Sequence, residues 1–156
     1  IDPTVVFYMM KKLECTPDEM DTFLNKRSGM LGVSGISSDA RDIQQAVDAG
    51  NERAKLTVDL YTNRVINVVG GYYMQLGHVD AIAFTAGLGE NDAQMRERIL
   101  KDLEEGMGLS IDYELNKTIH GKECFISKPD SKIKVYVVPT NEELVIARDT
   151  CRLLGL

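Results

Sequence analysis

The chain has 156 residues and a formal net charge of −6, with 18 Lys and Arg against 24 Asp and Glu. This acidic balance argues against nucleic acid as the main partner, because phosphate backbones are bound by clustered basic residues. Hydrophobic residues make up 44% of the chain, which excludes wholesale disorder and suits one compact domain, and no apolar run approaches the roughly 20 residues of a membrane span, so we expect no membrane partner.

The first residues, Ile1-Asp2-Pro3, include neither an initiator Met nor the basic region of a signal peptide. We therefore expect a piece of a longer chain. A helix is predicted over 5–12, with Asp2 as its N-cap and Pro3 at the first helical position. The three cysteines are odd in number and widely spaced, which favours reduced thiols in a cytoplasmic protein; they are Cys15, Cys124 and Cys151.

Three further helices are predicted in the first half of the chain. Thr16 and Glu19 form a capping box at the start of a helix that runs to about Lys26. Residues 28–38 are rich in Gly and Ser with apolar residues between them, so we expect an ordered loop. The next helix covers 39–49, capped by Ser38 or Asp39. The longest helical pattern follows over 51–76, with apolar residues at three- and four-residue steps.

The second half alternates strands with helices. We predict a strand over 79–85, a helix over 91–105 with Asn91 and Gln94 as a capping box, an edge strand over 124–127, a strand over 134–139 and a helix over 140–154. This order implies an α/β fold with a mostly parallel sheet whose strands are covered by helices. Ligands of such sheets bind beyond the carboxyl ends of the strands, where two loops of interest lie.

The first of these loops is Phe84-Thr85-Ala86-Gly87-Leu88-Gly89-Glu90-Asn91. Gly87 and Gly89 would let a phosphate or sugar approach the main chain closely, and a helix start at Asn91 would favour anions. Two interpretations are open. The loop is either an adenosine site, with Leu88 and Met95 as its apolar surface, or a simple strand-to-helix turn.

The second loop is Pro139-Thr140-Asn141-Glu142-Glu143. We predict Thr140 as the N-cap of the last helix, with the Glu143 carboxylate reaching back to the Thr140 amide. Glu142 has no such local task. Its carboxylate is either a ligand of Mg²⁺, directly or through water, or merely complements the helix dipole.

A third candidate lies at Ser37-Ser38-Asp39-Ala40-Arg41. Arg41 falls in the first turn of a helix, where a cation is slightly unfavourable. This placement suggests a ligand or a partner carboxylate, with an ordinary solvated Arg as the alternative. His78 and His120 are the only histidines, and no Ser or Cys arrangement around them suggests a triad.

Together these loops resemble the acetate kinase family, within the sugar kinase, Hsp70 and actin superfamily. The matching stretches occur in the family's order, and Leu88 stands where many relatives have Ile. The resemblance implies that residues 1–156 are a single domain, part of an actin-like ATPase (ribonuclease H-like) fold and the carboxyl-terminal nucleotide-binding part of a two-domain acetate kinase. The stretches are Ser37-Ser38-Asp39-Ala40-Arg41-Asp42, Phe84 to Asn91, and Val138-Pro139-Thr140-Asn141-Glu142-Glu143-Leu144.

The resemblance also implies a chemistry. Acetate kinases transfer the γ-phosphoryl of ATP to acetate, reversibly and with Mg²⁺, and they form homodimers through this domain. Glu142 would be the magnesium-associated carboxylate. The nucleotide contacts would be Asp39, Ala40 and Arg41, and the adenosine site would be lined by Gly87, Leu88, Gly89, Glu90 and Asn91.

The departure from the family is the missing N-terminal domain. The asparagine, aspartate, histidine and arginines that carry out the transfer in the family have no counterpart here, so we predict no catalytic residue in this chain. Because phosphoryl transfer depends on positioning and charge stabilisation, we expect the chain to keep part of the nucleotide site but to be inactive alone. The alternatives are a propionate or butyrate kinase fragment, or a non-catalytic dimerisation module with its interface on 51–76.

Overall fold

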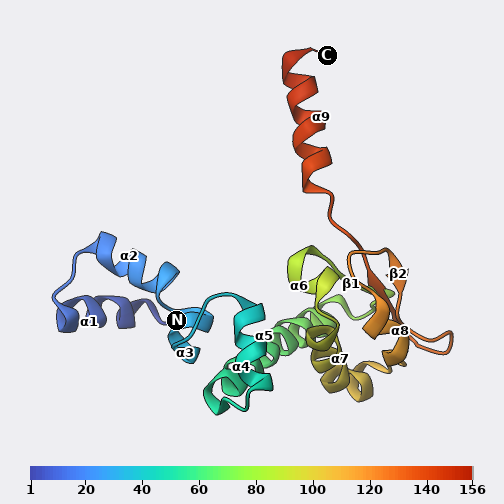
Figure 1. The fold of residues 1–156 in the computed structure, drawn as a ribbon, viewed down its shortest axis with the longest axis horizontal. Helices are drawn as coiled ribbons and strands as arrows, with labels where there is room; N and C mark the ends of the chain where they lie inside the picture. Colours follow the sequence, from blue (N-terminus) through green and yellow to red (C-terminus); the bar gives the residue numbers. More distant parts are fainter. Residues whose placement is uncertain (156) are drawn as a thin grey trace. The chain divides into compact units, whose positions relative to one another are not determined.

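The computed structural model describes residues 1–155 (Figure 1). The chain divides into two compact units between Tyr61 and Thr62. The first unit contains helices α1 (Pro3–Leu13), α2 (Pro17–Lys26), α3 (Gly29–Ser34) and α4 (Ala40–Asp48). The long helix α5 (Glu52–Leu76) begins in the first unit and ends in the second.

The ends of the first helices follow the predicted capping chemistry. Asp2 Oδ1 accepts a hydrogen bond from the Thr4 amide at 2.8 Å, and Pro3 opens α1. The capping box of α2 is present in both directions between Thr16 and Glu19. The Glu19 carboxylate accepts from the Thr16 amide at 2.8 Å, and this bond is the main reason that the pKa of Glu19 lies below its usual value.

The expected loop over 28–38 is wrong, because α3 occupies its centre. Two of its glycines lie at the ends of the helix, with φ of +59° at Gly29 and +68° at Gly35. Gly adopts the left-handed region without strain, and at the C-cap position of Gly35 it is the usual residue that ends a helix. The Gly- and Ser-rich composition therefore reflects the two ends of a short helix.

The core of the first unit forms where α2, α4 and the start of α5 bury apolar side chains. Asp39 is the N-cap of α4, one of the two predicted caps, and accepts from the Arg41 amide at 2.8 Å. Asn51 caps α5 by accepting from two amides of its first turn. The buried apolar residues of this unit are Met20, Ile43, Ala54 and Val58.

The second unit is built on a three-stranded sheet in the order β1-β3-β2. Its strands are β1 (Ala81–Phe84), β2 (Cys124–Phe125) and β3 (Lys134–Val137). β1 and β3 are parallel, and the short β2 pairs antiparallel with β3. The α/β class is confirmed as a small mixed sheet, and each strand is shorter than its predicted range.

Helices α6 (Ala86–Asn91), α7 (Ala93–Met107), α8 (Tyr113–Thr118) and α9 (Glu142–Leu154) complete this unit. The predicted helix start at Asn91 is wrong, because α7 begins at Ala93 with Asp92 as its N-cap. Asp92 Oδ1 accepts from the amide of Met95 at 2.8 Å. The residues between β1 and α7 form the separate short helix α6, so they are not an open turn.

The cap of α9 also differs from the prediction. Asn141 is the N-cap and accepts from the Leu144 amide at 2.9 Å, whereas Thr140 lies outside the helix. Every described residue of α9 is exposed. The helix α8 has no counterpart in the predicted elements; the side chain of Asp112 caps it by accepting from the Leu115 amide.

None of the helices within residues 1–155 has the combination of length and apolar composition that a bilayer crossing requires. The cysteines Cys15, Cys124 and Cys151 are free thiols, as the sequence predicts.

Candidate functional site

The parallel pairing of β1 and β3 brings two loops to one edge of the sheet. Phe84, the last residue of β1, is in register with Val137, the last residue of β3. The amide of Val138 then donates to the carbonyl oxygen of Phe84 at 2.8 Å. Because parallel strands end at the same edge, the glycine-bearing helix α6 and the residues that lead to α9 begin side by side.

Thr140 joins these two loops directly. Its amide donates to Glu90 Oε1 at 2.6 Å. Its hydroxyl oxygen accepts from the Ala86 amide at 3.2 Å and forms a hydrogen bond with the Thr85 hydroxyl. We call this set of contacts the Thr140 clasp. The predicted capping box between Thr140 and Glu143 is therefore wrong, because the carboxylate that binds the Thr140 amide comes from Glu90.

The ionisation of Glu90 fits its place in the clasp. The hydrogen bond from the Thr140 amide is the main cause of a lowered pKa at Glu90, with partial burial acting in the opposite direction. A carboxylate that accepts amide hydrogen bonds is stabilised in its charged form. At neutral pH Glu90 is therefore an anion, and in this form it accepts the hydrogen bond from the Thr140 amide.

The two glycines of α6 have different surroundings. A Cβ added at Gly87 would meet no atom within 4 Å, so the main chain there is open. A Cβ at Gly89 would lie 3.1 Å from the carbonyl carbon of Phe84. Gly89 is therefore needed for packing against the strand end, and Gly87 alone of the two leaves room for a ligand.

The remaining predicted residues of this loop are partly committed to the fold. Asn91 does not cap α7; its side-chain amide donates to the Gly87 carbonyl at 3.2 Å. Leu88 is half-buried. Met95 is only 6% exposed, so it packs in the core and does not provide the apolar ligand surface that the sequence suggested.

Ala86 has a strained backbone at the start of α6. Its φ of +58° lies in the left-handed region, which costs an L-residue other than Gly about 1 kcal/mol. Such residues persist where surrounding contacts impose them, and they cluster at ligand sites. Here the hydrogen bond from the Ala86 amide to the Thr140 hydroxyl supplies one such contact.

A buried arginine fastens this loop to the core. Arg96 is 0% exposed, and its Nη1 donates to the Gly89 carbonyl at 2.9 Å. Its Nε donates to Asn116 Oδ1 at 2.7 Å, and its Nη2 donates to the carbonyls of Asn116 and Ile119. Burial lowers the pKa of Arg96, which stays far above neutral pH.

Sequence reasoning missed Arg96 and Asn116, although one signal was available. Arg96 lies at helical spacing from Ile99, Leu100 and Leu103, which are all buried. A charged residue within an apolar helical stripe must find buried partners, since a lone buried charge is very costly.

Glu142 lies in the first turn of α9 and is exposed. Its carboxylate makes no hydrogen bond or ion pair with any other residue of the described chain. Residues 1–155 contain no group of three or more His, Cys, Asp or Glu arranged to hold a metal. A single free carboxylate fits Mg²⁺, which commonly uses one or two carboxylates together with waters and substrate phosphates.

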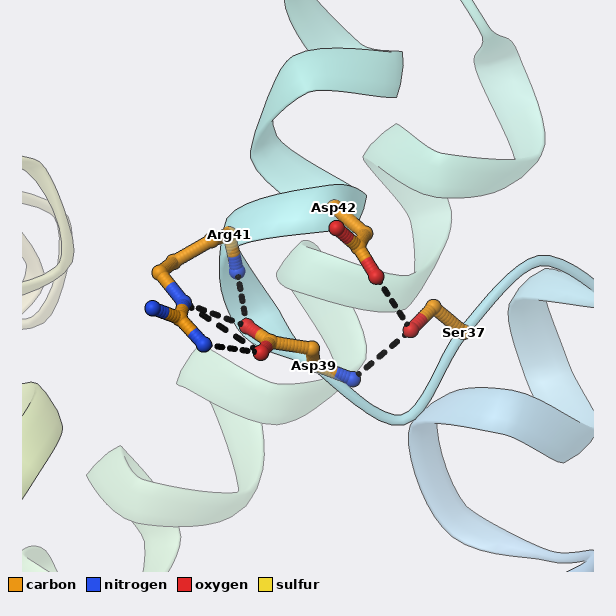
Figure 2. Close-up of polar contacts among 4 residues, drawn as sticks. All are labelled: Ser37, Asp39, Arg41 and Asp42. Carbon is orange, nitrogen blue, oxygen red and sulfur yellow. Dashed lines mark hydrogen bonds and ion pairs between the residues drawn. The ribbon is translucent and has the colours of Figure 1, made fainter.

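In the first unit, Asp39 and Arg41 form a local ion pair (Figure 2). Arg41 Nη2 lies 2.6 Å from Asp39 Oδ2, and the Arg41 side chain is 86% exposed. The same Asp39 carboxylate caps α4, and its hydrogen bonds from Arg41 lower its pKa to about 2. The partner carboxylate suggested for Arg41 is thus Asp39, in an exposed pair of the kind that contributes little to stability.

The Ser37 hydroxyl completes this cluster (Figure 2). It donates to Asp42 Oδ2 at 2.7 Å and accepts from the Asp39 amide at 3.0 Å. These bonds fix the turn before α4. The half-buried Ala40 is the first residue of that helix.

Comparison with known proteins identifies the family. The model of the acetokinase family matches residues 1–148. The chain belongs to this family. It is 53% identical over 153 residues to an acetate kinase of Finegoldia magna, a match that covers 98% of this chain and 38% of that protein.

Solved structures agree. The crystal structure of Porphyromonas gingivalis acetate kinase superposes with a TM-score of 0.88 at 44% identity, covering 99% of this chain and 38% of that one. A propionate kinase of Francisella tularensis superposes with a TM-score of 0.83 at 35% identity, covering 96% of this chain and 37% of that one. The α/β fold is thus that of the corresponding part of acetate kinases, and the chain spans well under half the length of these relatives.

Proposed function

We propose that this chain supplies part of the nucleotide and magnesium site of an acetate kinase, which converts ATP and acetate to ADP and acetyl phosphate reversibly. In this proposal, residues 1–156 are the carboxyl-terminal nucleotide-binding part of a two-domain enzyme. The Thr140 clasp is the observation that carries it. The clasp joins the glycine-bearing loop to the start of the helix that carries Glu142, as a nucleotide site with an adjacent cation requires.

The glycine-bearing loop and the start of α9 have different tasks in this proposal. The open main chain at Gly87 and the half-buried Leu88 would lie against the adenosine. Glu142 would hold Mg²⁺, directly or through water, and the bound ion would neutralise phosphate charge. Gly89 and Asn91 contribute chiefly by shaping the loop, through close packing on Phe84 and a bond to the Gly87 carbonyl.

The assignment of Asp39, Ala40 and Arg41 as nucleotide contacts rests on the family motif. Arg41 is exposed and, within residues 1–155, forms its ion pair with Asp39. An exposed pair of this kind is weak, so an anionic ligand could compete with Asp39 for the guanidinium. ADP binding should weaken in Arg41→Gln, and Arg148→Gln provides an exposed arginine control outside the motif.

ADP titrations with and without Mg²⁺, on the wild type and on Glu142→Ala, test the central assignment. We expect Mg²⁺ to raise the affinity for ADP in the wild type and to lose this effect in Glu142→Ala, with the magnesium-free affinity preserved. Glu143→Ala removes a neighbouring exposed acid from the same helical turn and should keep the effect. If Glu142→Ala responded to Mg²⁺ like the wild type, Glu142 would not be the ligand.

We further infer that the chain does not catalyse phosphoryl transfer alone. The groups that stabilise the transferring phosphoryl in this family have no counterpart among these residues, and this chemistry depends on such groups. Acetyl phosphate formation, followed by hydroxamate coupling, should be undetectable with the 156-residue chain. A rate near that of a full-length acetate kinase would refute this inference.

Propionate kinase is the second candidate, favoured by the structural match to the Francisella tularensis protein. We expect the acyl pocket to lie outside this chain. Replacing the corresponding segment of the Finegoldia magna acetate kinase with this chain should therefore leave the preference for acetate over propionate unchanged. A shift toward propionate would place part of the acyl specificity here.

We also propose a cytoplasmic homodimer that uses α5. This helix exposes large apolar side chains on its surface, and such residues are enriched at subunit interfaces. Sedimentation should show a dimer, and a tight dimer that ignores ADP would favour a pure dimerisation module. The exposed apolar residues are Leu56, Leu60, Val68, Tyr72, Met74 and Leu76.

A further inference from the structure

Glu90 lies within the predicted nucleotide loop, yet its carboxylate is bound to the protein itself. Its Oε1 accepts from the Thr140 amide at 2.6 Å, and its carbonyl accepts from the Gly121 amide at 3.1 Å. We propose that Glu90 is a positioning residue that ties the start of α9 to the glycine-bearing loop, so that Glu142 and the nucleoside surface at Gly87 are held as one unit. This proposal rests on the proposed function and adds to it a coupling between the two halves of the site.

The first support is the number of contacts that converge on Thr140. Its amide is bound by Glu90, and its hydroxyl is bound by Thr85 and by the Ala86 amide. The amide and the hydroxyl of Thr140 are therefore both fixed to the loop after β1. Asn141, the cap of α9, and then Glu142 follow directly in sequence.

The second support is that α9 is not packed into the core. The helix has no buried residue, and all of its described side chains are exposed. A helix of this length is marginal in water without packing. Within residues 1–155, the orientation of Glu142 is therefore set mainly through Asn141 and the Thr140 clasp.

The third support is that the opposite end of the clasp is anchored. Arg96, fully buried, donates to the Gly89 carbonyl at 2.9 Å, and Gly89 packs closely against the main chain of Phe84. The Glu90 side chain thus extends from a loop held by the core. Rigid contacts of this kind transmit a coupling free energy between sites, and that coupling acts equally in both directions.

The competing role for Glu90 is a direct contact with the nucleotide. The two roles differ in what Glu90→Ala removes. A direct contact would weaken ADP binding whether or not Mg²⁺ is present. A positioning role would leave the magnesium-free affinity close to that of the wild type and would reduce the additional affinity that Mg²⁺ provides.

ADP titrations with and without Mg²⁺, followed by NMR chemical shifts of the 156-residue chain, separate these outcomes. We expect Glu90→Ala to reduce the Mg²⁺-dependent gain in affinity by about fivefold or more, within the usual range of coupling between sites. Glu90→Gln keeps an oxygen that can accept from the Thr140 amide and should restore most of the gain. The double variant Glu90→Ala with Glu142→Ala should lose no more of the gain than Glu142→Ala alone, since both residues act on the same Mg²⁺-dependent increase in ADP affinity.

Two control variants complete this experiment. Glu143→Ala removes an exposed carboxylate of the first turn of α9 and should leave the gain unchanged. Thr140→Val removes the hydroxyl contacts but keeps the amide, so it should cause a partial loss. A wild-type gain that persists fully in Glu90→Ala, or an equal loss with and without Mg²⁺, would overturn the positioning role.

A second measurement decides the coupling without any ligand. In the amide spectrum of Glu90→Ala, we expect the signals of Thr140 and of the first turn of α9 to shift together with those of α6. Shifts confined to α6 would refute the coupling. Failure of the wild type to bind ADP would instead count against the proposed function, while the amide spectrum would still decide whether Glu90 joins the two loops.

Discussion

Helices α7 and α9 follow neighbouring parallel strands of one sheet, yet they are held in different ways. α7, which comes after β1 and α6, buries seven of its residues, including Ile99, Leu100 and Arg96. α9, which comes after β3, buries none. Both have an N-cap with an oxygen that accepts from a first-turn amide, Asp92 in α7 and Asn141 in α9.

The comparison separates what a cap does from what packing does. A cap is worth about 1 kcal/mol, whereas helices in proteins gain most of their stability from burying an apolar face. α7 is therefore part of the core and fixes the glycine-bearing loop through Arg96. α9 depends on its cap and on the Thr140 clasp. Glu142, which α9 carries, is therefore held less rigidly than the glycine-bearing loop.

A large loss of stability should come from a change in the buried polar network behind α7. Asn116 is 0% exposed, accepts from Arg96 Nε and donates to the Ala93 carbonyl. Asn116→Ala leaves the buried guanidinium short of a partner, and we expect it to lower the free energy of unfolding by about 3 kcal/mol. Urea unfolding would measure this. Asn67→Ala, on the exposed surface of α5, is the matched control and should change stability by less than about 0.5 kcal/mol.

A pair of leucine truncations compares the two helices directly. Leu100 of α7 is 0% exposed and Leu153 of α9 is 80% exposed. Leu100→Ala should cost about 2–5 kcal/mol, because it removes core contacts and leaves a cavity. Leu153→Ala should be within about 0.5 kcal/mol of the wild type in the same urea unfolding experiment. Comparable losses in the two variants would show that α9 is packed in solution.

The caps give a smaller, more local contrast. Asp92→Ala and Asn141→Ala each remove one acceptor of a first-turn amide, and each should cost its own helix about 1 kcal/mol. In Asp92→Ala we expect the whole unit to lose stability, because α7 belongs to the core. In Asn141→Ala we expect faster amide exchange only within α9, with the urea midpoint unchanged. A lowered midpoint in Asn141→Ala would contradict this division.

The same division explains what the sequence could predict. The capping box of Thr16 and Glu19, the helix α5 and the strands β1 and β3 were all predicted, because each leaves a local signal within a few residues. The α/β class and the family followed from these elements and from the three loop motifs. The two strand-end loops also fall at one edge, as parallel pairing requires.

What the sequence could not supply were partners far apart in the chain. Thr140 had the pattern of a cap, but its amide is bound by Glu90 and its hydroxyl by Ala86, both distant in sequence. Asn91 had the pattern of a cap as well, yet Asp92 performs that task. Neighbouring residues of similar chemistry compete for such positions, and tertiary contacts decide between them. The roles of the individual ligand residues remain predictions.

The smallest expected effect concerns pH and the clasp. The pKa of Glu90 is lowered in the folded chain, mainly by the Thr140 amide, so the unfolded chain binds more protons in the interval between the folded and unfolded values. The stabilising contribution of Glu90 is therefore fully present above the unfolded pKa of about 4.3 and is lost as pH falls through the lower folded value.

Because the protonated carboxyl is a poorer acceptor for the Thr140 amide, acidification should release α9 before it affects α7. Amide exchange of the wild type from about pH 6 to about pH 3 would test this, once corrected for the intrinsic rate. We expect protection in α9 to fall at a higher pH than protection in α7. In Glu90→Gln, which cannot ionise, the α9 protection should not show this step, and a step that persisted would assign the titration to another group.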